Sequence, residues 1–78
     1  MIKLTNIQKN NNIISVNVVS NESYPHQSYK LIFDIVSEKY SASINEPDKF
    51  DVFKIIHKLS SYTKDGKKLP EIDCIACF

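Results

Sequence analysis

Hydrophobic and polar residues alternate along the first part of the chain with the two-residue period of a half-buried β-strand. The alternation runs through residues 2–7 and again through residues 13–19, and the Asn-rich residues 8–12 between them predict a turn. The residues that share the apolar face are Ile2 and Leu4 in the first segment and Ile14, Val16 and Val18 in the second. The two segments therefore predict an antiparallel hairpin, which a loop over residues 20–28 follows.

The same period is clearest in residues 29–36, whose second face is also partly apolar, as is typical of a central strand. It resumes in residues 39–44, so a second hairpin is predicted. A two-residue loop at 37–38 would place Ile35 opposite Tyr40, with both side chains on the apolar face. This turn lacks the Gly or Asn that tight hairpins favour, so a longer loop with shifted pairing is the alternative.

A helix is predicted from residues 45–48 to about Tyr62. Asn45 can cap its N-terminus, Pro47 is tolerated in the first turn, and acidic residues suit the positive end of the helix dipole. The apolar stripe expected to face the sheet consists of Val52, Ile55, Ile56 and Leu59, flanked by Phe53 and Tyr62.

Alternation in residues 69–78, after the single glycine at Gly66, predicts a last strand. In this strand we expect Cys74 on the buried face and Ile75 and Cys77 on the other face. The chain, residues 1–78, is too short for a second hydrophobic core. The pattern therefore predicts one small α+β domain, with an antiparallel sheet of about five strands in the order β-β-β-β-α-β and one helix on one face.

Charge and composition exclude several classes of function. Ten lysines against nine acidic residues give a net charge of +1, and the absence of arginine, the side chain that best reads guanine edges, disfavours sequence-specific DNA binding. No apolar stretch approaches the length of a membrane span, and no secretion signal is evident. Two cysteines are too few for a secreted disulfide framework. We therefore expect a cytoplasmic protein without membrane contact.

Three stretches resemble a known group of proteins: residues 2–15 (IKLTNIQKNNNIIS), the helix opened by Pro47, and the sequence Leu69-Pro70-Glu71 before the last strand. They are similar to small uncharacterised proteins of AT-rich Gram-positive bacteria. The resemblance implies only the order of four strands, a helix and a strand, and it assigns no site residues.

The chain lacks the usual signatures of catalysis and metal binding. Cys74 and Cys77 have redox or zinc-knuckle spacing, but residues three apart in a strand point to opposite faces. His26 and His57 lie at spacings that match no zinc finger, and one glycine cannot form a phosphate loop. We therefore expect no metal, no cofactor and no enzymatic activity.

The candidate site lies on the predicted helix, on the side opposite the core stripe. Five residues fall on this side or next to it: Phe50, Lys54, His57, Lys58 and Ser61. Residues 48–68 carry six lysines and three aspartates, a net charge of +3, and Asp51 is well placed to neutralise only Lys54. The alternative interpretation is that Phe50 folds back over the preceding loop and the lysines are merely solvated.

These features favour a non-enzymatic module that binds another protein through the helix, with Phe50 as its anchor. By analogy, it would be an inhibitor or accessory protein from a bacterium, phage or mobile element that acts by occupying a partner's surface. Self-association through a sheet edge is a further expectation. The alternative is binding of phosphate or nucleic acid through the lysines of this region: Lys49, Lys54, Lys58, Lys64, Lys67 and Lys68.

Overall fold

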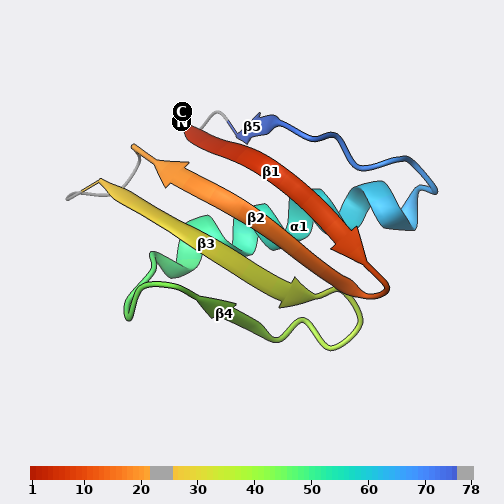
Figure 1. Ribbon diagram of the computed structural model, residues 1–78, viewed down its shortest axis with the longest axis horizontal. Coiled ribbons are helices and arrows are strands. Elements are labelled where there is room, and N and C mark those ends of the chain that lie inside the picture. Colours follow the sequence, from red (N-terminus) through yellow and green to blue (C-terminus); the bar gives the residue numbers. More distant parts are fainter. Residues whose placement is uncertain (22–25, 76–78) are drawn as a thin grey trace.

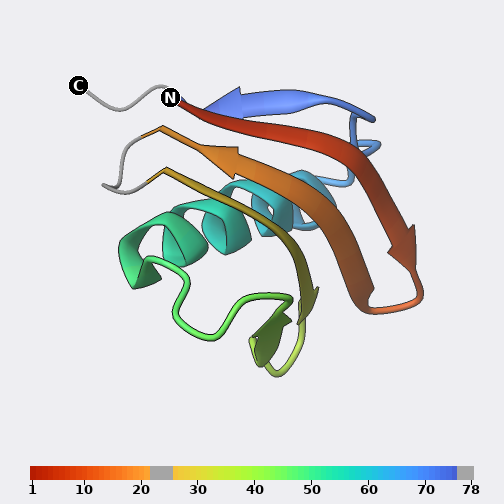
Figure 2. The ribbon, with the colours of Figure 1, turned by 60° about the vertical axis from the view of Figure 1, so that its left-hand side comes forward.

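The computed structural model describes residues 1–21 and 26–75. The elements are β1 (Ile2–Asn10), β2 (Ile13–Ser20), β3 (Gln27–Asp34), β4 (Tyr40–Ala42), α1 (Lys49–Lys64) and β5 (Asp73–Ile75). The strands form one sheet in the order β4-β3-β2-β1-β5, and every neighbouring pair is antiparallel. The helix lies across one face of this sheet (Figures 1 and 2). The predicted α+β class and order of elements are confirmed.

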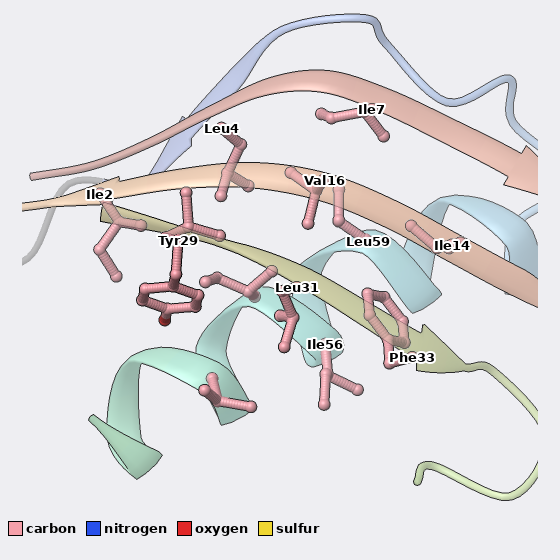
Figure 3. Packing of buried hydrophobic residues seen from close by; sticks show 13 residues of the cluster. Ile2, Leu4, Ile7, Ile14, Val16, Tyr29, Leu31, Phe33, Ile56 and Leu59 are labelled. Atoms are coloured by element: carbon pink, nitrogen blue, oxygen red, sulfur yellow. The ribbon is translucent and has the colours of Figure 1, made fainter. Parts of the chain in front are cut away.

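The hydrophobic core lies between α1 and the covered face of the sheet (Figure 3). The predicted helix stripe is confirmed, because its four residues are at most 7% exposed. Phe53, which we expected to flank the stripe, is instead 61% exposed. Phe53 lines an open hollow between α1 and the loop that carries Glu38, so no element covers its ring.

β1 is longer than predicted because a β-bulge interrupts its alternation. The pairing moves from Thr5–Asn17 to Gln8–Ser15, so β1 contains one extra residue at this point. Asn6 has a positive φ of 51°, a conformation that Asn adopts more readily than most residues. The bulge returns Ile7 to the buried face, and the turn then needs only residues 11 and 12.

The second hairpin has the longer loop, so the predicted pairing of Ile35 with Tyr40 is wrong. Tyr40 pairs with Phe33, a shift of two residues, which keeps the same side chains on the covered face. The Asp34 carboxylate accepts hydrogen bonds from the backbone N–H groups of residues 36 and 37, at 2.8 and 3.1 Å. Glu38 closes the loop with a φ of 63°. Side-chain capping by Asp34 thus replaces the missing glycine of a tight turn.

The helix begins later than predicted, and Asp48 rather than Asn45 is its N-cap. The Asp48 carboxylate accepts hydrogen bonds from the backbone N–H groups of Phe50 (2.9 Å) and Asp51 (3.2 Å). Pro47 therefore precedes the cap, where its fixed φ extends the incoming chain. After the helix ends at Lys64, Gly66 turns the chain with a φ of 71°.

In β5 the predicted inward and outward residues are exchanged. Ile75 pairs with Ile2 and packs against the core, whereas Cys74 pairs with Lys3 and is exposed. Directly paired residues in an antiparallel sheet point to the same face, so the pairing with β1 decides the orientation. The predicted outward position of Cys77 lies outside the described residues.

Candidate functional site

Asp51 lies in the first turn of α1 but points into the protein. It is 2% exposed, and its Oδ2 accepts a hydrogen bond of 2.6 Å from the hydroxyl of Ser20, which is fully buried at the end of β2. Burial, followed by the negative charges of Asp51 and Asp48, raises the pKa of the neighbouring Tyr29 phenol to about 12. The only acidic residue within α1 is therefore part of the interior and not of the outward face of the helix.

The outward face of α1 presents two phenylalanines. Phe50 is 77% exposed, so its ring does not fold back over the preceding loop, and Phe53 is 61% exposed one turn further along the helix. Lys54 and His57 are also exposed on this side of the helix. We call these four residues the aromatic-cationic face. Its position follows from helix geometry, because the buried stripe occupies the opposite side.

An open hollow of about 450 Å³ lies beside this face. It runs between α1 and the loop that joins β3 to β4. Its floor includes Ser60, whose buried hydroxyl has no hydrogen-bond partner among the described residues. The lining residues are Glu38, Phe53, Lys54, Ile56, His57, Ser60 and Lys64. Lys54, His57 and Lys64 line the hollow beside the Phe53 ring, so apolar and basic groups adjoin there.

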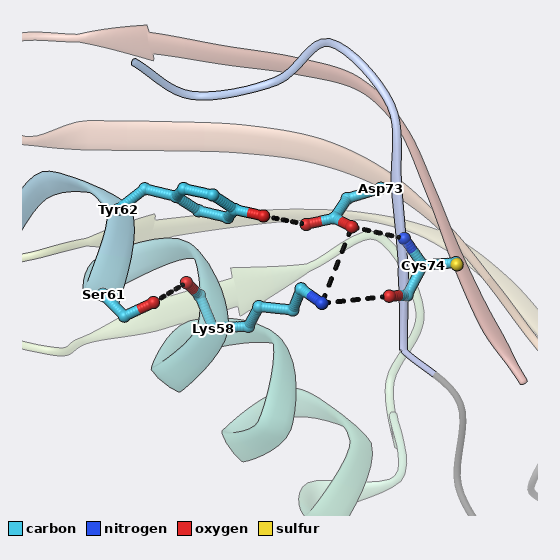
Figure 4. Close-up of polar contacts among 5 residues, drawn as sticks. All are labelled: Lys58, Ser61, Tyr62, Asp73 and Cys74. Atoms are coloured by element: carbon cyan, nitrogen blue, oxygen red, sulfur yellow. Dashed lines mark hydrogen bonds and ion pairs between the residues drawn. The ribbon is translucent and has the colours of Figure 1, made fainter. Parts of the chain in front are cut away.

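Lys58 and Ser61 make hydrogen bonds within the protein. The Lys58 ammonium donates a hydrogen bond of 3.2 Å to the carbonyl oxygen of Cys74 and lies 3.6 Å from the Asp73 carboxylate (Figure 4). The Ser61 hydroxyl donates to the carbonyl oxygen of Lys58, at 2.6 Å. Of the predicted site residues, Phe50, Lys54 and His57 are exposed on the outward side of α1, and Ser61 shares this side by helical spacing but is half-buried. The Lys58 ammonium is turned toward β5.

Asp73 is the centre of the contacts that hold β5 to α1 (Figure 4). Its carboxylate accepts hydrogen bonds from the Tyr62 hydroxyl and from the backbone N–H of Cys74, both at 2.8 Å. The first of these bonds is the main cause of the raised pKa of the Tyr62 phenol, because it favours the protonated form. This cluster explains why a strand of three residues keeps its place at the sheet edge.

Sequence reasoning missed Phe53 as a surface residue because its large apolar ring suggested a place beside the core. The helical spacing contained a usable signal, since Phe53 is three residues from Phe50 and only about 60° from it around the helix axis. A residue this close to an outward position belongs to the outward face unless a neighbouring element covers it.

In residues 1–21 and 26–75, no three His, Cys, Asp or Glu side chains gather as ligands of a metal ion would. Over the same residues, no helix combines the length and apolar character needed to cross a bilayer. Comparison with known proteins found no matching family model, no matching curated protein and no matching solved structure.

Proposed function

We propose that the protein is a non-enzymatic binding module that docks onto another protein through the aromatic-cationic face of α1. The observation that carries this proposal is the exposure of Phe50 and Phe53, at 77% and 61%, one turn apart on a helix whose opposite side is well packed. Single exposed apolar side chains are normal on protein surfaces. Two neighbouring rings are a larger apolar area, and burying a phenylalanine side chain stabilises an interface by about 1.5–3 kcal/mol.

The charges around the two rings define the partner. Lys49, Lys54 and Lys64 are exposed on α1, together with His57, and the helix's own carboxylate at Asp51 is buried. A partner surface with an apolar pocket for the rings and Asp or Glu at its rim would complement both features. A compact protein of this kind would act as an inhibitor or accessory protein by covering the partner's surface, a role supported only by analogy.

Binding of phosphate or nucleic acid through the lysines is the competing proposal. Its support is the excess of lysine in residues 48–68. The orientation of Lys58 toward Asp73 and Cys74 takes one ammonium group out of that row. Binding of this kind would weaken steeply with salt and would be lost after nuclease treatment.

Site-specific photo-crosslinking distinguishes these proposals. A benzophenone amino acid replaces Phe50 or Phe53 in cells that express the gene naturally, and adducts are identified by mass spectrometry with and without nuclease. The matched control carries the same group at Ile72. This residue follows α1 in the chain, is 68% exposed and lies beside β1, away from the outward face of the helix.

The proposal predicts one protein adduct that forms from both helix positions, survives nuclease and is absent from the control. An adduct with nucleic acid would establish the competing proposal. Equal labelling from all three positions, or none from the helix, would contradict docking through this face.

A further inference from the structure

The two edges of the sheet differ in whether side chains form hydrogen bonds with their outward-pointing backbone N–H and C=O groups. At the β5 edge, the N–H of Cys74 donates to the Asp73 carboxylate at 2.8 Å, and its carbonyl oxygen accepts from Lys58 at 3.2 Å. Side chains thus occupy the groups that a further strand would need. Capping of this kind protects an edge strand from pairing with another chain.

At the β4 edge, the outward groups belong to Tyr40 and Ala42. The bonds from Ser43 N to Lys30 O (3.0 Å) and from Asp34 N to Lys39 O (2.9 Å) fix the phase of the β3–β4 ladder. Because ladder bonds recur at every second residue, Ser41 bonds to β3, and the residues on either side of it turn their N–H and C=O groups away. Among the described residues, no side chain donates to or accepts from these four groups.

We propose that β4 pairs antiparallel with β4 of a second copy, about a two-fold axis that passes through Ser41. In this arrangement Tyr40 lies opposite Ala42 of the second copy, and both of these pairs exchange N–H and C=O bonds. The edge is therefore self-complementary: each copy offers two donors and two acceptors at the positions that the rotation brings together. This inference is independent of the docking function of α1.

The side chains at the edge fit a second copy. Tyr40 is 37% exposed, and the opposing residue, Ala42, is small enough to leave room for its ring. The next pair outward joins Lys39 with Ser43 of the second copy, so no like charges lie directly opposite each other. Only three residues of each copy form β4, which predicts a rapidly reversible dimer.

Sedimentation equilibrium of the full chain in reducing buffer measures this dimer. Ala42→Pro removes an outward N–H that β3 does not use, so the strand can still form, and about a tenfold or greater rise in the dimer dissociation constant is expected. Cys74→Ser, at the capped edge, is the matched control and should leave the dissociation constant unchanged. Circular dichroism establishes that each variant is folded.

Charged substitutions at Ser41 provide the second measurement. Ser41 is exposed, and in the proposed dimer it lies opposite Ser41 of the second copy. Ser41→Asp and Ser41→Lys should each weaken self-association, whereas an equimolar mixture of the two should form heterodimers more tightly than either variant pairs with itself. The proposal is overturned if the unmodified chain remains monomeric up to about 1 mM. It is also overturned if a dimer forms that neither Ala42→Pro nor the Ser41 charges affect.

Discussion

Replacing Asp51 by alanine tests the local structure that keeps the helix carboxylate away from the outward face. The substitution removes the acceptor of the 2.6 Å hydrogen bond from Ser20, in a place where both residues are at most 2% exposed. It also removes a negative charge from the first turn of α1, where the helix dipole stabilises it.

The expected loss can be estimated from these two contacts. A hydrogen bond to a charged group contributes about 1.5–3 kcal/mol, and a carboxylate in the first turn adds about 0.3–1 kcal/mol. Removing a buried charge also ends its desolvation cost, which offsets part of the loss. We therefore expect Asp51→Ala to lower the free energy of unfolding by about 2 kcal/mol, out of a total of roughly 4–12 kcal/mol for a chain of this length.

Urea unfolding followed by circular dichroism measures this change, together with Ser20→Ala and the double variant. In a double-mutant cycle, the coupling between Asp51 and Ser20 should be about 1 kcal/mol or more. A loss of less than about 0.5 kcal/mol, the range of ordinary surface substitutions, or strictly additive effects would refute the inward orientation of the carboxylate.

Three further outcomes follow from the same structure. Phe50→Ser and Phe53→Ser should each change the free energy of unfolding by less than about 0.5 kcal/mol in urea titrations, because both rings are exposed; larger losses would mean that the rings are packed. Asn6→Gly should be tolerated, whereas Asn6→Val should cost about 1–2 kcal/mol at a φ of 51°, and equal melting temperatures would contradict the bulge. The pKa of the Tyr29 phenol is raised to about 12 in the folded protein, and that of Tyr62 is also raised, so both phenols stay protonated in the fold at a pH where they ionise in the unfolded chain. Their contribution to the free energy of unfolding should be complete below pH 10 and lost as the pH rises through 12. A free energy of unfolding that does not fall over this range would contradict the burial of Tyr29.

The elements of the fold were predictable because burial repeats with a regular period. Alternation identified the five strands, although it placed the wrong side chains of β5 inward, and the stripe that contains Val52 and Leu59 identified the helix and its covered side. The strand pairing was predicted wrongly where a single residue shifts the register between neighbouring strands. Asn6 adds a residue to β1, and Asp34 caps a loop that shifts the β3–β4 pairing by two residues.

The candidate site was predictable only in part, because contacts between distant segments decide which helix residues remain outward. Phe50 and His57 lie where the helix period places them. Lys58 lies about 40° from Lys54 around the helix axis. Its side chain turns toward Asp73, fifteen residues further along the chain. No local pattern signals that contact, just as none signals that Asp51 reaches Ser20 on β2.

Affinity for the crosslinked partner is the most direct measure of the central claim that the outward face of α1 is the binding surface. Isothermal titration of the purified partner should be carried out with the unmodified protein, with the Phe50→Ser/Phe53→Ser variant and with Ile72→Ser as the control. Loss of two buried rings predicts an affinity at least about 100-fold weaker for the double variant and an unchanged affinity for the control. An unchanged affinity for the double variant would contradict the claim.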